Sequence, residues 1–143
     1  MPKASISLKD RFKTTVNIRE HTVRVDEPTD KGGDDTGPAP SEMLLGAIGS
    51  CMAITMRLYA DRKEWPLQGV DIKMESTRKK ADECPDYDNP DGRKEVTVIT
   101  SSITLHGPLT KEQRVRIAEI GGRCPVHRTV AEGAHFIDEL LVE

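Results

Sequence analysis

The feature that most constrains the fold is an uncharged stretch, residues 43–56, near the middle of the sequence. Apolar side chains recur there at helical spacing on two sides, one formed by Leu44, Ile48, Cys51, Thr55 and Leu58 and the other by Leu45, Met52, Met56 and Tyr59. A helix that is apolar on both sides is buried rather than lying on a surface. Pro40 suits the first position of this helix, and the Trp-Pro pair that follows it predicts an end near Lys63.

The segments around this helix predict strands and two shorter helices. Before the central helix we expect two or three antiparallel strands over 6–25 and a loop over 26–40. After it we expect a long hairpin, with strands 70–77 and 95–105 joined by a polar loop over 81–93. The chain should then form a helix after Thr110 that Gly121-Gly122 ends, a helix from Cys124-Pro125 that Gly133 ends, and a last strand over 136–142. Thr110 and Gln113 have the spacing of a capping box. The pattern predicts an α+β fold in a single domain, 1–143, without internal repeats.

Composition excludes several classes of function. The chain has 143 residues, a net charge of -3 and a pI near 5.8, so we expect no nucleic-acid partner and no membrane partner. No apolar run approaches the roughly 18–20 residues of a membrane span, and Met1 to Asp10 lacks the apolar core and small-residue site of a signal peptide. Aromatic residues make up only 3% of the chain, which indicates an aliphatic core and favours a dimer that shares it. Three cysteines are too few for a secreted disulfide scaffold, so we expect a cytoplasmic protein.

Cys124 is the cysteine with the most suggestive neighbours. It lies at the predicted start of a short helix, beside Arg123, His127 and Arg128. A helix N-terminus and nearby cations lower the pKa of a thiol, so these neighbours predict a reactive thiolate. A structural cysteine at a helix start is the alternative. His127, one turn further on, is either a hydrogen-bonding and cationic partner of a cysteine or a capping or surface histidine.

The other two cysteines carry weaker signals when taken alone. Cys51 lies in the middle of the central helix, where a small buried core residue is the ordinary interpretation. Cys84 lies in a polar loop without an adjacent cation, so we expect no role for it. The sequence has no C-x-x-C pair, and a metal site would need at least three of Cys51, Cys124, His127 and Glu42 around one ion. We expect neither a metal nor a cofactor.

Two separated motifs resemble the OsmC/Ohr family, the osmotically inducible protein C and organic hydroperoxide resistance proteins. The first comprises Asp26-Glu27-Pro28, Gly32-Gly33, the run Gly37-Pro38-Ala39-Pro40-Ser41-Glu42-Met43-Leu44-Leu45, and then Cys51. The second is Cys124-Pro125-Val126-His127-Arg128-Thr129. Two motifs in the right order are far more specific than either alone, and the resemblance extends over nearly the whole chain.

The resemblance implies a fold and a reaction. The fold would be an intertwined homodimer, with a six-stranded antiparallel sheet on each side and paired central helices between them. Cys51 would be the peroxidatic thiolate and Cys124 the resolving thiol. The reaction would reduce an organic hydroperoxide to an alcohol and form a Cys51–Cys124 disulfide, which an external dithiol would then reduce.

Two departures from the family pattern concern charged residues. Family members with peroxidase chemistry carry a Glu directly after the helix-opening proline, whereas Ser41 stands there in this sequence and Glu42 follows. A shift of one residue turns a helical side chain by about 100°, so Glu42 is either the catalytic substitute or a first-turn partner of the helix dipole. The family's arginine partner has several candidates: Arg24 and Arg19 in the N-terminal strands, or Arg128 and Arg123 beside the second cysteine.

The missing Glu favours a second hypothesis. A dimer that kept the scaffold could bind a ligand or sense redox state without catalysis. Dispensable Cys51 and Cys124, together with tight binding of a hydrophobic ligand, would select that hypothesis.

Overall fold

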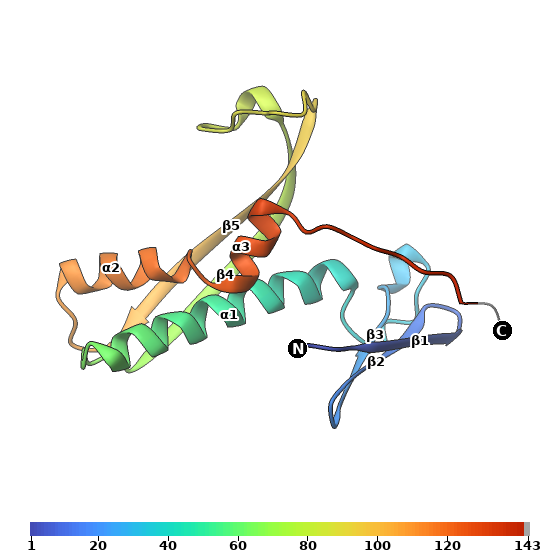
Figure 1. The fold of residues 1–143 in the computed structure, drawn as a ribbon, viewed down its shortest axis with the longest axis horizontal. Coiled ribbons are helices and arrows are strands. Elements are labelled where there is room, and N and C mark those ends of the chain that lie inside the picture. The colour runs from blue at the N-terminus through green and yellow to red at the C-terminus, as the bar shows by residue number, and fades with distance from the viewer. Residues whose placement is uncertain (142–143) are drawn as a thin grey trace. The chain divides into compact units, whose positions relative to one another are not determined.

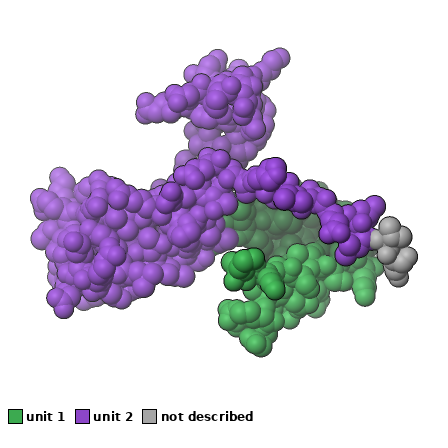
Figure 2. Space-filling model, in the orientation of Figure 1, with its two compact units in different colours: residues 1–46 green, residues 47–143 purple. Residues whose placement is uncertain are grey.

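Residues 1–141 are described by the structure, a computed structural model, and they form a mixed α+β fold (Figure 1). The elements are β1 (Ser5–Asp10), β2 (Lys13–Ile18), β3 (His21–Val25), η1 (Thr29–Lys31), α1 (Pro40–Arg62), β4 (Gly69–Lys80), η2 (Ala81–Glu83), β5 (Glu95–His106), α2 (Lys111–Gly121) and α3 (Pro125–Glu132). The predicted α+β class is confirmed. The chain divides into two compact units, Met1–Gly46 and Ala47–Glu143, which are coloured separately in Figure 2. The single domain stays a prediction.

The first unit contains a three-stranded antiparallel sheet of order β1-β2-β3. Ile6 lies opposite Val16, and Val16 lies opposite Val23, so one row of β-branched side chains crosses all three strands. Such cross-strand apolar pairs stabilise a sheet and fix its register. Arg11 and Arg19 adopt positive φ angles of 53° in the two tight turns. The predicted strands over 6–25 are therefore confirmed.

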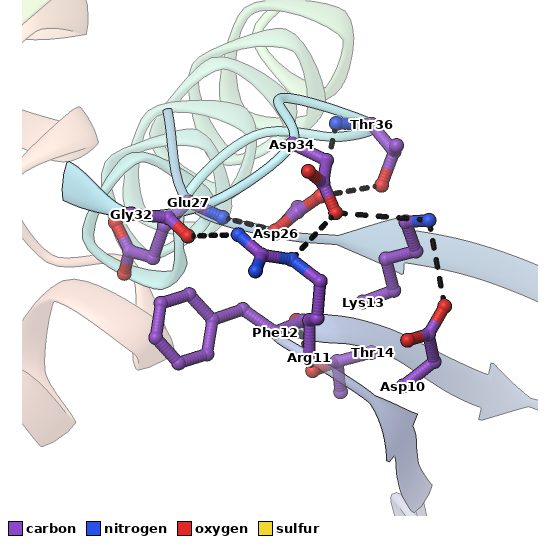
Figure 3. A network of polar contacts seen from close by, with 10 residues as sticks. All are labelled: Asp10, Arg11, Phe12, Lys13, Thr14, Asp26, Glu27, Gly32, Asp34 and Thr36. Carbon is purple, nitrogen blue, oxygen red and sulfur yellow. Dashed lines mark hydrogen bonds and ion pairs between the residues drawn. The ribbon is translucent and has the colours of Figure 1, made fainter. Parts of the chain in front are cut away.

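The loop after β3 folds around the buried carboxylate of Asp26, which is 2% exposed. Figure 3 shows this carboxylate accepting hydrogen bonds from Thr36 Oγ1 at 2.7 Å, Glu27 N at 2.7 Å and Thr36 N at 3.1 Å. These bonds, led by the one from the Thr36 hydroxyl, lower the pKa of Asp26 to about 2. A Cβ added at Gly33 would lie 1.9 Å from Glu27 O, so the loop also requires glycine there.

A second carboxylate ties this loop to the β1–β2 turn. Asp34 accepts a hydrogen bond from Arg11 Nε at 3.0 Å and lies 3.7 Å from Lys13 Nζ, as Figure 3 shows. Arg11 also donates to Gly32 O at 2.6 Å. These side chains are partly exposed, so their ion pairs contribute little stability compared with the buried Asp26 network.

Helix α1 begins at Pro40 as predicted and ends one residue before the predicted Lys63. One side of it is buried, through Ile48, Met52, Met56, Tyr59 and Ala60. Other apolar residues of α1 are exposed, with Ile54 at 61% and Leu58 at 65%. The expectation of burial on all sides is therefore wrong for a single chain, because only one side of this helix meets the rest of the chain.

Within the described residues, one helix is long and apolar enough to cross a membrane by length and composition alone. An 18-residue window of α1 has a mean hydropathy of 1.4, and 28% of that window is buried. The expectation that no apolar stretch approaches the length of a membrane span is wrong by this measure, because the window in α1 extends beyond the uncharged residues 43–56. A core helix of a globular protein meets the same criterion, and the buried residues of α1 belong to such a core.

The second unit packs α1, α2 and α3 with a long hairpin. Strands β4 and β5 pair without interruption from Gly69 opposite His106 to Lys80 opposite Glu95, which confirms the predicted hairpin. The buried core comprises Ile48, Met52, Met56, Tyr59, Ala60, Leu67, Leu105, Leu109, Ile117 and Cys124. It is almost entirely aliphatic and sulfur-containing, as the low aromatic content predicts.

The two C-terminal helices have the predicted boundaries. The Thr110 side chain accepts a hydrogen bond from Gln113 N at 3.1 Å, and Gln113 Oε1 accepts one from Thr110 N at 2.9 Å. This reciprocal capping box starts α2, which ends at Gly121. Helix α3 ends where Gly133 adopts a φ of 87°.

The predicted last strand is wrong as far as the structure describes it. Residues 134–141 form no strand, and Phe136, Ile137, Leu140 and Leu141 are 78–90% exposed. Val142 lies outside the described residues. The apolar pattern predicted a strand, but a strand also needs a neighbour for its backbone hydrogen bonds, and sequence pattern does not supply one.

Candidate functional site

Two cysteines far apart in sequence meet in the second unit. Cys51 is half-buried on α1 and packs against the core that contains the fully buried Cys124. Cys51 lies close enough to Cys124 to raise the pKa of its thiol. Both are free thiols. The two thiols are thus neighbours, as the disulfide implied by the family resemblance requires, and the roles of both cysteines stay predictions.

Local backbone structure holds Cys124 in place. Cys124 is the N-cap of α3, and its Sγ accepts a hydrogen bond from His127 N at 3.2 Å. Pro125 occupies the first helical position, where its missing N–H costs nothing. Cys124 N donates in turn to Gly121 O at 3.3 Å, which links this cysteine to the end of α2. The Cys-Pro pair thus starts α3 as predicted.

Burial, rather than neighbouring charge, dominates the acidity of Cys124. Burial raises its pKa above the ordinary value because a thiolate loses solvation there. A hydrogen bond from His127 N lowers the pKa of Cys124, while the neighbouring Cys51 raises it, so the net direction is upward. The prediction that nearby cations lower the pKa of Cys124 is wrong. A protonated, buried thiol suits a resolving residue better than an attacking one.

His127 contacts this site in a different way from the one expected. Its backbone N–H, rather than its imidazole, donates to Cys124 Sγ. Its half-buried side chain lines a partly open cleft of about 320 Å³ in the second unit. His127 therefore lines the cleft from the first turn of α3, the helix for which Cys124 is the N-cap.

Both apolar and polar side chains line this cleft. Ile48, Met52, Met74, Ile99 and Val130 line it together with Thr97, Ser101, His127 and Ala131. Ile48 and Met52 are the neighbours of Cys51 on α1, at positions three before and one after it. An apolar cavity of this size with a few polar groups is typical of a small-molecule site.

Several cleft residues were absent from the sequence prediction. Met74 on β4 and Thr97, Ile99 and Ser101 on β5 line the cleft, and the three residues of β5 alternate as one face of a strand does. Period-two alternation identifies such a face. It does not show which helix covers the face, because that depends on packing between distant segments.

The candidate arginines are all exposed. In the second unit, Arg128 Nε lies 3.7 Å from Glu132 Oε1, and Arg123 is also at the surface. In the first unit, Arg24 is on β3 and Arg19 is in the β2–β3 turn. The exposed pair of Arg128 with Glu132 is an ordinary helix-surface contact between positions four apart. Which arginine serves the site stays a prediction.

Glu42 has a defined structural contact in the first unit. Its Oε1 accepts a hydrogen bond from Ala39 N at 2.8 Å. Glu42 thereby satisfies a backbone donor at the start of α1, as the third helical residue does in a capping box. This contact agrees with the alternative in which Glu42 acts in the first turn of the helix. The adjacent Ser41 is exposed, and a catalytic role for Glu42 stays a prediction.

Cys84 lies apart from the paired cysteines in the sequence and in the fold. It follows η2 in the loop between β4 and β5, where its Sγ donates to Lys80 O at 3.4 Å. Its side chain is half-buried in this loop. Among residues 1–141, no group of three or more His, Cys, Asp or Glu side chains is arranged to hold a metal ion.

Comparison with known proteins identifies relatives of this fold. A protein-family model described as OsmC-like protein matches residues 32–137. An OsmC-like protein from Mycoplasma pneumoniae superposes with a TM-score of 0.66 at 19% identity, over 92% of this chain and 87% of that one. No curated protein matches the chain.

Several of the similar solved structures have names that refer to hydroperoxides. An organic hydroperoxide resistance protein OsmC from Legionella pneumophila has a TM-score of 0.65 at 13% identity, over 91% of this chain and 88% of that one. An organic hydroperoxide resistance protein from Elizabethkingia anophelis has a TM-score of 0.62 at 14% identity, over 90% and 87%. At such identities the likeness shows the fold.

Proposed function

The chain belongs to the OsmC-like protein family, and we propose that it is a thiol-dependent peroxidase that reduces organic hydroperoxides to alcohols. The observation that carries this proposal is the proximity of Cys51 to the buried Cys124, together with a cleft lined by Ile48 and Met52, which flank Cys51 on α1. The names of the Legionella and Elizabethkingia proteins add support at the level of the family.

In the proposed reaction, the Cys51 thiolate attacks the terminal oxygen of ROOH. The O–O bond breaks, the alkoxide takes a proton to leave as ROH, and Cys51 becomes a sulfenic acid. Cys124 then attacks the Cys51 sulfur, giving the Cys51–Cys124 disulfide and releasing water. An external dithiol reduces this disulfide by thiol–disulfide exchange and is itself oxidised to a disulfide.

The burial of the two thiols supports this division of labour. Cys51 is the half-buried member of the pair, whereas Cys124 is fully buried and has a raised pKa. A peroxide can reach only a sulfur with some access, and a buried, protonated thiol is protected from direct oxidation. The apolar cleft near α1 and α3 would hold the alkyl group and keep water out.

We further propose that the protein works as a homodimer in a reducing compartment such as the cytosol. The exposed apolar residues of α1 and the exposed segment 136–141 are surface that a second copy would cover. Cations that the reaction needs near Cys51 would come from Arg24 or another of the candidate arginines. Sedimentation that shows a stable folded monomer at micromolar concentration would contradict the dimer.

A turnover assay tests the peroxidase. Reduced protein is mixed with cumene hydroperoxide and excess dithiothreitol, and cumyl alcohol is measured. We expect catalytic alcohol formation in the wild type and in Cys84→Ser, and none above background in Cys51→Ser. Cys124→Ser, treated with one equivalent of cumene hydroperoxide before any dithiothreitol is added, should form one equivalent of alcohol and retain a sulfenic acid on Cys51. Equal alcohol formation by the wild type and Cys51→Ser would refute the proposal.

One observation favours a second candidate, a non-catalytic ligand-binding or redox-sensing protein. Glu42 caps α1 and Ser41 occupies the usual Glu position, so the carboxylate of the family's peroxidases is not in its expected place. Tight binding of cumyl alcohol that is unchanged in Cys51→Ser, without any turnover, would select this candidate.

A further inference from the structure

Two thioethers line the cleft beside the paired cysteines. Met52 follows Cys51 directly on α1 and is 3% exposed, while Met74 is half-buried on β4. Both side chains contribute to the wall of the 320 Å³ cleft. The chain has five methionines in all, so two of them are placed where an organic hydroperoxide would bind.

The absence of a side chain at Gly49 determines where the Met74 sulfur lies. A Cβ added at Gly49 would lie 2.9 Å from Met74 Sδ and 3.8 Å from its Cγ. The Met74 sulfur therefore packs against the backbone of α1 two residues before Cys51. The thioether is thus held against α1 in the wall of the cleft instead of turning freely in solvent.

From this arrangement we propose that Met74, with Met52 behind it, is a site of sulfoxide formation by the hydroperoxide bound in the cleft. This inference rests on the proposed function, because that function brings an organic hydroperoxide into the cleft. The thioether sulfur attacks the terminal oxygen of ROOH, the O–O bond breaks, and the products are ROH and a sulfoxide. Sulfur is oxidised by two electrons and the peroxide is reduced by two, so no further reactant is needed.

Oxidation of Met74 limits the enzyme when peroxide is in excess. A sulfoxide is polar, and placing one against Ile48 and Ile99 weakens binding of an alkyl group in this cleft. The Cys51 reaction then slows, although both cysteines remain intact. A methionine sulfoxide reductase with its thiol donor would reduce the sulfoxide back to the thioether and restore this activity.

A matched comparison tests the oxidation site. Met43 is half-buried like Met74 but lies in the first unit, outside the cleft. Reduced protein is treated with cumene hydroperoxide or with hydrogen peroxide, which has no alkyl group, and sulfoxides are quantified by peptide mass spectrometry. We expect the ratio of Met74 to Met43 sulfoxide to be several-fold higher with cumene hydroperoxide. An equal ratio for the two oxidants would overturn the inference.

The same experiment separates this inference from the peroxidase itself. Loss of the Cys51 and Cys124 thiols without selective Met74 oxidation would refute the methionine site and leave the peroxidase standing. In Cys51→Ser, selective Met74 oxidation should persist, because the thioether reacts independently of the thiol.

A second variant tests the consequence for activity. Met74→Leu keeps the volume of the side chain but has no sulfur to oxidise. Its turnover should decline more slowly than that of the wild type during prolonged exposure to cumene hydroperoxide. The same rate of decline in both proteins would refute the proposed limitation.

Discussion

Gly121 at the end of α2 lies where α2 meets Met56 of α1. A Cβ added at Gly121 would lie 2.2 Å from Met56 Cε, 3.2 Å from its Cγ and 3.4 Å from its Sδ. Carbon atoms in contact are ordinarily about 3.5–4.0 Å apart, so the methyl end of Met56 must move by more than an ångström. Met56 is fully buried, and closely packed surroundings leave little space for that movement.

We predict that Gly121→Ala destabilises the protein by about 1–2 kcal/mol. Overpacking typically lowers the free energy of unfolding by about 1–3 kcal/mol. The better helix propensity of alanine raises it by less than about 1 kcal/mol at the last residue of a helix. Because Cys124 N donates to Gly121 O, the displacement also reaches the buried cysteine. We therefore expect slower closure of the Cys51–Cys124 disulfide in this variant.

A double-mutant cycle measured by urea unfolding checks this reasoning. Met56→Leu keeps a similar volume but lacks the Cε atom that approaches closest. In that background, Gly121→Ala should cost at least about 1 kcal/mol less, which appears as a coupling free energy between the two positions. An unchanged stability of Gly121→Ala, or the same loss in both backgrounds, would refute the packing argument.

Three further predictions concern single groups. The pKa of Asp26 falls from 3.8 to about 2 on folding, so its stabilising contribution is complete above pH 3.8 and is lost as the pH falls through 2. Between pH 5 and pH 2, the melting temperature of Asp26→Asn should therefore depend less on pH than that of the wild type. The same dependence of melting temperature on pH in both proteins would contradict a stabilising Asp26 network. Thr110→Ala removes the α2 cap and should cost about 1 kcal/mol in urea unfolding, whereas Thr110→Ser should cost much less. At pH 8, iodoacetamide should label Cys124 far more slowly in the folded protein than in the unfolded protein, because the thiol is buried. The labelling rate of the folded protein should still rise above pH 9.0, because burial raises the pKa of Cys124. Equal labelling rates in the folded and unfolded proteins would show that the thiol is accessible.

The parts of the fold that depend on neighbouring residues could be predicted from the sequence. The start of α1 at Pro40, the Thr110–Gln113 capping box and the Cys124-Pro125 start of α3 are all local arrangements, and each is confirmed. Their physical causes operate within one helical turn. The long hairpin was predictable for a similar reason, because two alternating strands flank one polar loop.

The parts that depend on packing between distant segments could not be predicted in this way. Cys124 has cationic neighbours in sequence, yet its pKa rises because α1 and the rest of the core exclude water from it. The face of β5 that lines the cleft can be identified from the alternation of residues in the sequence. The helices that pack on this face cannot be identified in that way. The segment 136–141 has the pattern of a strand and finds no neighbour among the described residues.

The central claim is that a hydroperoxide oxidises one of two contacting cysteines and that the other closes the disulfide. Its most direct measurement is peptide mass mapping, under non-reducing conditions, of reduced protein treated with one equivalent of cumene hydroperoxide. The account predicts a single new crosslink between the peptides of Cys51 and Cys124, with Cys84 still a free thiol. Crosslinks that involve Cys84 instead, or three free thiols after the peroxide is consumed, would contradict it.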